Sequence, residues 1–203
     1  ALKWGLPWSA GVAITPLPEP KKPAYLQSVI ADALKRGAKV VNAEEGGGQQ
    51  YGTLVRPAVV YPVTSDMKLW HEEQFGPVIP IAVYEDIQEV YDYYATSPYG
   101  QQAAVFTSDA GASSELLDTL STVVGRININ TQCGRSPDVF PFSARRSSAL
   151  GTMSVTEAIK VFSIETVVAA KHDDTNEKIL KGYEKTSNFL QPLRSAESLK
   201  SEL

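Results

Sequence analysis

Two short stretches of this chain hold most of the side chains that could do chemistry. The first, HEEQFGPVIP at residues 71–80, places two adjacent acids and an aromatic ring before a Gly-Pro turn and an apolar run. The second, TQCGRSPDVFPF at residues 131–142, has no periodicity but combines an arginine, a cysteine, an aspartate and two phenylalanines. Loops of such composition on a rigid sheet often carry function. The first stretch predicts a carboxylate and a ring at the mouth of a sheet, where open α/β sheets bind ligands.

The composition limits the kinds of site that the chain can hold. Its 203 residues are 43% hydrophobic, which is enough for a sizeable core. The net charge is −4 and no block of five basic residues occurs, so we expect neither a nucleic-acid partner nor a membrane partner. No apolar run approaches the ~20 residues that span a bilayer. The two histidines stand far apart without motif partners, which argues against a histidine metal site.

The single cysteine constrains both chemistry and compartment. Cys133 alone excludes an internal disulfide and a Cys-x-x-Cys metal site, and it favours a reducing compartment, which we expect to be the cytoplasm. The first residue is Ala1 and not a methionine, which is compatible with a piece processed or excised from something longer.

Hydrophobic periodicity predicts the elements that position these two stretches. Residues 1–20 contain four prolines and are interpreted as extended coil. We expect helices at residues 23–36, 67–73, 87–94 (with Asp86 and Glu89 as a capping box), 113–122 and 156–161. We expect strands at residues 38–41, 53–63, 78–84, 102–106, 125–130 and 164–169. The glycine-rich segment 44–52 lacks the lysine of a phosphate-binding loop and is interpreted as a hairpin tip.

The order of these elements predicts the fold class. A βαβαβ order over residues 78–130 predicts a mostly parallel sheet with right-handed crossovers, and so an α/β domain. Beyond Lys171 the chain is rich in charge and poor in β-branched residues, which predicts a surface helix or a disordered segment. We therefore divide the chain into a domain at residues 1–170 and a charged C-terminal tail at residues 171–203.

Three motifs together resemble the aldehyde dehydrogenase superfamily, and within it the non-phosphorylating NADP-dependent glyceraldehyde-3-phosphate dehydrogenases. WHEEQFGPVIP is similar to the family's acid-acid-x-Phe-Gly-Pro signature. RININTQCGRSPDVFPF is similar to its asparagine-containing strand and Arg-x-x-Asp-x-Phe-Pro-Phe substrate loop, and VAITPLP to the coil after its catalytic-cysteine region. The resemblance implies that residues 1–170 are part of a three-layer α/β catalytic domain with a mainly parallel sheet.

The resemblance also implies roles for individual residues. Glu73 is similar to the acid that hydrogen-bonds the nicotinamide ribose, and Phe75 to the ring beside the nicotinamide, so NADP is the expected cofactor, with NAD also open. Arg135 matches the arginine that holds the substrate phosphate, a role suited to a planar cation with several donors. Phe142 matches the aromatic that lines the aldehyde tunnel, and Asn130 matches the asparagine at the end of the preceding strand.

Each of these residues also has a purely structural interpretation. Glu73 would then be an exposed acid at a helix end and Phe75 a core residue. Arg135 would pair with Asp138 and fix the loop. Phe142 and Asn130 would have a structural role alone.

Several parts of a complete catalytic site are missing from the sequence. The family's nucleophilic cysteine, general-base glutamate, oxyanion asparagine and Rossmann-like cofactor domain all precede the coil that opens this chain. Formation of a thioester needs a thiolate beside an oxyanion donor. Cys133 lies where the family has no nucleophile, and we expect it to be a small buried loop residue. We therefore expect no catalytic residue in this chain.

The resemblance thus implies a contributing role in an oxidoreductase. The chain would supply cofactor and phosphate contacts for oxidation of glyceraldehyde 3-phosphate, or a similar small-molecule aldehyde, to the acid through a cysteine thioester. A missing N-terminal half or a partner chain would supply the nucleophile, and the chain alone would be inactive. Residues 164–169 resemble the family's last strand, beside which a partner subunit's arm adds, so we expect a homo-oligomer.

Two other functions stay open at this point. One is a non-catalytic, aldehyde-dehydrogenase-like module for binding or scaffolding, favoured by the missing half-site. Ala144, Ala149 and Ser154 also favour it, because they stand where the family carries a glycine-rich segment. The other is an aldehyde dehydrogenase of a different substrate class, such as a semialdehyde enzyme.

Overall fold

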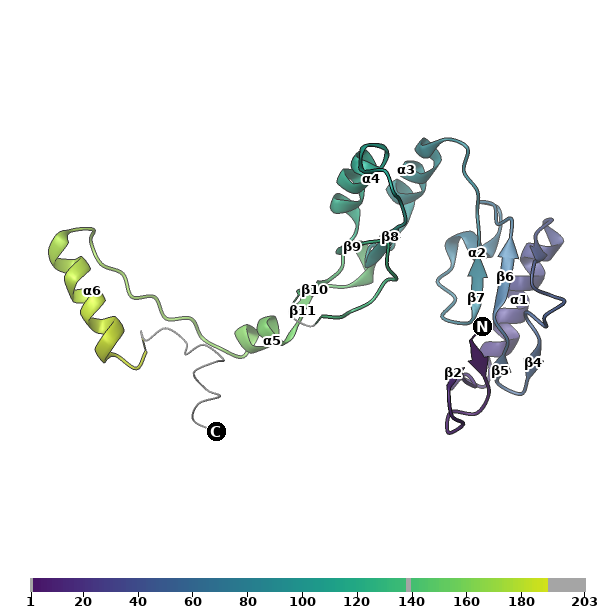
Figure 1. Ribbon diagram of the computed structural model, residues 1–203, viewed down its shortest axis with the longest axis horizontal. Helices are drawn as coiled ribbons and strands as arrows, with labels where there is room; N and C mark the ends of the chain where they lie inside the picture. The colour runs from purple at the N-terminus through teal and green to yellow at the C-terminus, as the bar shows by residue number, and fades with distance from the viewer. Residues whose placement is uncertain (1, 138–139, 190–203) are drawn as a thin grey trace. The chain divides into compact units, whose positions relative to one another are not determined.

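The computed structural model describes residues 2–137 and 140–189. The chain divides into two compact units, Ala1–Ser154 and Val155–Leu203. Figure 1 follows the elements along the chain, and in the first unit strands and helices alternate, so the α/β class is confirmed. No helix in the described ranges is both long enough and apolar enough to cross a membrane.

The first long helix, α1 (Lys22–Lys35), lies where its periodicity predicts it. Pro23 occupies the first turn, where a missing N–H costs nothing, and Lys35 lies in the last turn, where a cation meets the negative end of the helix dipole. Gly37 follows with φ of +102°, a left-handed conformation that ends helices and favours glycine. The inward face repeats at helical spacing and consists of Leu26, Val29, Ile30 and Ala33.

A three-stranded sheet packs against α1 and holds the larger core. Its strand order is β3 (Lys39–Val40), β6 (Ala58–Tyr61), β7 (Val78–Pro80). Strand β3 runs antiparallel to β6, whereas β7 runs parallel to β6 with Val59 opposite Ile79. The α1 face and these strands bury one cluster that also includes Val55, Val63, Met67 and Leu69.

A βαβ unit forms a second, smaller core. Strand β8 (Gln102–Val105) pairs in parallel with β9 (Arg126–Ile129), and α4 (Ala110–Val123) is the crossover between them. The side chain of Asp109 accepts a hydrogen bond from the Ala112 N–H and so caps α4. Ala103, Leu120 and Val124 are the buried residues of this cluster.

The remaining elements complete the described chain. They are β1 (Lys3–Trp4), β2 (Val12–Ile14), β4 (Gln50–Tyr51), β5 (Leu54–Val55), α2 (Lys68–His71), α3 (Ile87–Thr96), β10 (Phe142–Ser143), the 3-10 helix η1 (Arg146–Ser148), β11 (Thr152–Met153), α5 (Val155–Val161) and α6 (Asp174–Thr186). Strand β1 pairs in parallel with β2, and β4 with β5 and β10 with β11 form antiparallel pairs.

Several local predictions are confirmed. The capping box of α3 is present, because Asp86 accepts from the Gln88 N–H while the Glu89 carboxylate accepts from the Asp86 N–H. The glycine-rich segment leads into the hairpin of β4 and β5, which turns at Gly52 with φ of +62°. Helix α5 lies at the predicted place, and α6 confirms a helix within the charged tail. Residues 190–203 of that tail lie outside the described residues.

The prediction of one sheet across residues 78–130 is wrong. Strand β7 pairs with β6, β8 pairs with β9, and the two pairs belong to separate sheets. Strand β7 ends at Pro80, well short of residue 84. Its partner β6 ends at Tyr61 before Pro62, which has no N–H to continue a ladder.

Two other predictions about strands are also wrong. Residues 1–20 are not all coil, because β1 and β2 pair with each other; prolines prevent a helix here but leave room for short extended pairs. Residues 164–169 form no strand in the structure, and Ile164 is 95% exposed. A β-branched segment becomes a strand only with a neighbour to hydrogen-bond, and the described residues offer this one none.

Candidate functional site

The segment that carries Glu73 and Phe75 is a tight connection between α2 and β7. The side chain of Gln74 closes it, because its Nε2 donates to the Val78 carbonyl at 2.6 Å and its Oε1 accepts from the Gly76 N–H at 2.6 Å. Phe75 has φ of +46°, a conformation that is uncommon away from glycine, and its side chain is 73% exposed. Phe75 is therefore not a core residue of this chain, and its ring is presented to the outside.

The two adjacent acids of this segment have different surroundings. Glu72 accepts a hydrogen bond from the Tyr25 hydroxyl at 2.6 Å. That bond to a carboxylate, with burial adding to it, raises the pKa of Tyr25 to about 12. Glu73 is exposed and takes part in no hydrogen bond or ion pair with any described residue. Both carboxylate oxygens of Glu73 are thus available to a ligand.

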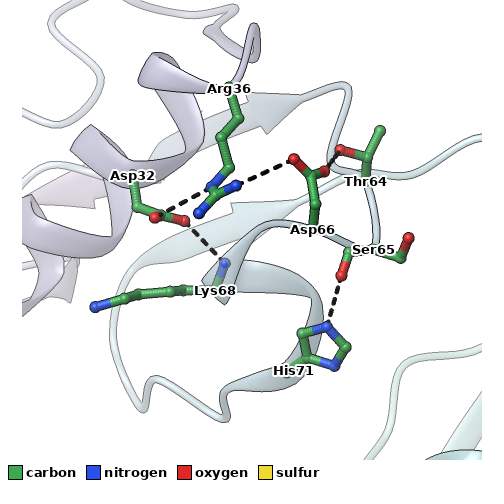
Figure 2. Close-up of polar contacts among 7 residues, drawn as sticks. All are labelled: Asp32, Arg36, Thr64, Ser65, Asp66, Lys68 and His71. Atoms are coloured by element: carbon green, nitrogen blue, oxygen red, sulfur yellow. Dashed lines mark hydrogen bonds and ion pairs between the residues drawn. The ribbon is translucent and has the colours of Figure 1, made fainter.

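A polar network joins α1 to the start of α2, and Figure 2 shows its members. One oxygen of Asp32 accepts from the Lys68 backbone N–H at 2.9 Å, and the other pairs with Arg36 Nε at 3.3 Å. Arg36 Nη1 also lies 3.3 Å from Asp66 Oδ2. The Lys68 N–H is the main reason that the pKa of Asp32 lies below its ordinary value. Asp32 thus caps a helix to which it does not belong.

The rest of this network holds the turn that leads into α2. Thr64 donates through Oγ1 to Asp66 Oδ1 at 2.5 Å, and His71 Nε2 lies 2.7 Å from the Ser65 carbonyl oxygen (Figure 2). These bonds hold the turn before α2 and the last residue of α2, where the HEEQFGP segment begins.

Arg135 and Phe142 are brought together by the structure. The guanidinium carbon of Arg135 lies 5.1 Å from the centre of the Phe142 ring, within the range of a cation–π contact. Arg126 fixes the loop backbone here, because its Nη1 and Nη2 donate to the carbonyls of Arg135 and Ser136 at 3.0 and 2.8 Å. The alternative pairing of Arg135 with Asp138 lies outside the described residues.

Asn130 is occupied by the backbone of the neighbouring strand. Its Oδ1 accepts from the Thr107 N–H and its Nδ2 donates to the Thr107 carbonyl, both at 2.8 Å. Its φ of +52° is one that asparagine tolerates better than most residues. The side chain thereby joins the ends of β8 and β9, which fits the structural interpretation of this residue.

The prediction that Cys133 is buried is wrong, because the residue is exposed. The loop backbone next to it is held by β8, since the Gly134 N–H donates to Gln102 Oε1 at 3.1 Å. Buried Asn128 donates to the same Gln102 oxygen at 3.2 Å and approaches Cys133 Sγ at 3.8 Å. These contacts hold the loop, and Cys133 is still exposed at the surface.

Sequence reasoning missed Tyr25, Asp32 and Arg126 as residues that hold the site. A signal existed for Asp32, which stands four residues before Arg36 on a predicted helix, a spacing that favours an ion pair. No local pattern links Tyr25 to Glu72 or Arg126 to the loop backbone, because these contacts depend on the tertiary fold. No hydrogen bond or ring contact between described residues joins the Glu73–Phe75 pair to the Arg135–Phe142 pair.

Three comparisons with known proteins agree on one family. The model of the aldehyde dehydrogenase family matches residues 1–168. The NADP-dependent glyceraldehyde-3-phosphate dehydrogenase of Streptococcus equinus is 34% identical over 158 residues, which are 78% of this chain and 31% of that protein. The 3-sulfolactaldehyde dehydrogenase of Priestia aryabhattai is 28% identical over 164 residues, which are 81% of this chain and 33% of that protein.

The fold agrees with a solved structure as well. The NADP-dependent glyceraldehyde-3-phosphate dehydrogenase from Bacillus halodurans C-125, complexed with NADP, superposes with a TM-score of 0.71 at 34% identity, over 78% of this chain and 32% of that one. The chain thus spans about a third of the length of the relatives that it matches. Because the family model covers most of its residues and the fold agrees, the chain belongs to the aldehyde dehydrogenase family.

Proposed function

We propose that residues 1–170 form part of the catalytic domain of an NADP-dependent aldehyde dehydrogenase, with residues 171–203 as a charged tail. The observation that carries the proposal is the pair of Glu73 and Phe75: a carboxylate with both oxygens available, two residues before an exposed ring. We use the term assembled enzyme for this chain together with the part that bears the nucleophile, on one polypeptide or two.

The Glu73–Phe75 pair fits one end of a dinucleotide. A carboxylate accepts hydrogen bonds from two neighbouring ribose hydroxyls, and bonds to a charged acceptor are stronger than neutral ones. The ring of Phe75 offers a flat apolar wall beside the nicotinamide. NADP, when bound, accepts the hydride that leaves the aldehyde carbon. The residues of this chain hold and orient that end of the cofactor.

The Arg135–Phe142 pair fits an anionic substrate. The names of two relatives contain a phosphorylated aldehyde and a sulfonated one, which share a tetrahedral oxyanion at the end away from the aldehyde. A guanidinium offers parallel N–H donors to two oxygens of such a group. Contact with the Phe142 ring limits the freedom of Arg135, so less conformational entropy is lost on binding.

The nucleophile belongs, in this proposal, to the part of the assembled enzyme outside this chain. A thioester route needs a thiolate beside preorganised donors for the oxyanion. Cys133 stands instead on a loop near the side-chain amide of Asn128. That amide already donates a hydrogen bond to the Ala103 carbonyl at 3.1 Å. The contributions of this chain are orientation and charge complementarity.

The test is the substitution Glu73→Gln in the assembled enzyme. Glutamine keeps the shape of the side chain but loses the charge and one acceptor oxygen. We expect the KM for NADP to rise by about 10-fold, which corresponds to the loss of about one charge-assisted hydrogen bond. Glu44→Gln, a change of the same kind on an exposed turn, is the control and should leave that KM unchanged. Equal KM values for both variants would contradict the proposed ribose contact.

A further inference from the structure

One side of α1 lies along the whole segment that leads to Glu73 and Phe75. Near the end of α1, Asp32 caps the first turn of α2 through the Lys68 N–H at 2.9 Å (Figure 2). Near its start, Tyr25 holds the carboxylate of Glu72 at 2.6 Å. The first contact is to the first residue of α2 and the second is to the residue that follows it, so the helix and the residue after it are both held by α1.

The same side of α1 continues toward the ring. Lys22 Nζ lies 5.0 Å from the centre of the Tyr25 ring and 5.9 Å from the centre of the Phe75 ring. Leu26, which is fully buried, fills the space in front of Gly76: a Cβ on Gly76 would lie 2.6 Å from Leu26 Cδ1. Any side chain at residue 76 would therefore force Leu26 or the Phe-Gly-Pro turn to move.

The α2 helix cannot set its own orientation. It has four residues, far fewer than an isolated helix needs, and its own N-cap residue, Met67, makes no side-chain capping bond. The capping oxygen comes from Asp32, which Arg36 in turn holds at 3.3 Å and ties to Asp66. The direction in which Glu73 leaves α2 thus depends on contacts made by α1.

We propose, resting on the function assigned above to Glu73 and Phe75, that Tyr25 and Asp32 are positioning residues for the nicotinamide end of NADP. Neither side chain touches the cofactor in this account. Tyr25 holds the Glu72 carboxylate through a hydrogen bond. Glu73, the residue after Glu72, is then the acid whose carboxylate faces the ribose. Asp32 fixes the axis of α2 and with it the place where the segment emerges. Hydrogen bonds between neighbouring residues can hold a functional group to within a fraction of an ångström, and small displacements cost binding and rate.

The first experiment tests whether the Tyr25 contact exists in the 203-residue chain. Absorbance at 295 nm is followed against pH in the wild type, in Tyr25→Phe and in Glu72→Gln. We expect one phenol to titrate near 12, well above the ordinary value of 10.0, and to be absent from Tyr25→Phe. In Glu72→Gln it should titrate at lower pH, since the acceptor carboxylate is gone. A wild-type chain with no phenol that titrates near 12, or such a phenol that persists in Tyr25→Phe, would overturn the proposal.

The second experiment measures kinetics in the assembled enzyme. For Tyr25→Phe we expect the KM for NADP to rise by about 3- to 10-fold, while the KM for the aldehyde stays within twofold. A residue that served stability alone would lower the fraction of active enzyme, and with it the apparent kcat, without changing the KM for NADP. Tyr51→Phe is the matched control, because the Tyr51 hydroxyl donates to Gln49 in the hairpin at 2.9 Å, away from α2.

A conservative pair of substitutions at Asp32 completes the test. Asparagine can still accept from the Lys68 N–H, whereas alanine cannot, so Asp32→Asn should keep much of the NADP affinity that Asp32→Ala loses. If Glu73→Gln raises the KM for NADP but neither Tyr25→Phe nor Asp32→Ala does, positioning by α1 is wrong and the proposed function stands. If Glu73→Gln has no effect either, both fail.

Discussion

Replacing Arg135 with leucine is expected to raise the KM of the assembled enzyme for a phosphorylated aldehyde by about 10- to 100-fold. The reason is the loss of charge-assisted hydrogen bonds to the oxyanion, each among the stronger polar contacts in proteins. In the wild type the guanidinium carbon of Arg135 lies 5.1 Å from the centre of the Phe142 ring. Leucine keeps an apolar side chain beside this ring, so the substitution removes the N–H donors more than the packing. Steady-state kinetics with glyceraldehyde 3-phosphate measure the change.

Two controls separate anion binding from general damage. Arg135→Lys keeps the charge but not the planar fork, so its KM should fall between those of the wild type and the leucine variant. Arg56→Leu removes an arginine that lies 4.9 Å from the Trp4 ring, outside the proposed site, and should leave the KM unchanged. An aldehyde without an anionic group should be little affected by Arg135→Leu. Equal losses for charged and uncharged aldehydes would mean that Arg135 does not hold the substrate anion, and would favour another substrate class.

Replacing Leu26 with alanine is expected to lower the free energy of unfolding of the chain by about 2–5 kcal/mol, the range for a buried leucine cut back to alanine. Leu26 is 0% exposed and is among the largest fully buried side chains of the core between α1 and the first sheet. The substitution also opens a space in front of Gly76 and so loosens the Phe-Gly-Pro turn. Urea unfolding of the 203-residue chain gives the value from the shift in midpoint.

A leucine on the same helix provides the comparison. Leu34 is 45% exposed, so Leu34→Ala should change the free energy of unfolding by less than about 1 kcal/mol. Similar losses at the two positions would contradict the buried face assigned to α1.

The parts of the fold that sequence reasoning predicted are those set by local rules. The inward face of α1, its end at Gly37 and the capping box at Asp86 and Glu89 each depend on residues within a few positions of one another. The exposed hairpin turn at Gly52 follows from glycine's freedom at positive φ.

The errors arose where the outcome depends on distant partners. Residues 164–169 have the composition of a strand, yet a strand needs another edge, and residues 2–137 and 140–189 supply none to them. Strands β7 and β8 belong to separate sheets, and a periodicity argument over residues 78–130 does not detect this because it carries no information on strand pairing.

The candidate site divides in the same way. Composition singled out the two stretches, and the resemblance to the family pointed to Glu73, Phe75, Arg135 and Phe142, of which the last two meet as a cation and a ring. The exposure of Phe75 and of Cys133 could not be predicted, because it depends on how Gln74 and Gln102 bind nearby backbone. The supporting residues Tyr25 and Asp32 lie 47 and 36 positions from their partners Glu72 and Lys68, beyond the reach of any local pattern.

The most direct test of the central claim is NADPH formation from glyceraldehyde 3-phosphate by the 203-residue chain alone. The claim is that this chain holds cofactor and substrate groups while the nucleophile lies elsewhere in the assembled enzyme. It predicts no turnover above background for the wild-type chain and for Cys133→Ala alike, and turnover once the nucleophile-bearing part is present. Turnover by the chain alone that disappears in Cys133→Ala would contradict it, because the thiol on this loop would then be the nucleophile.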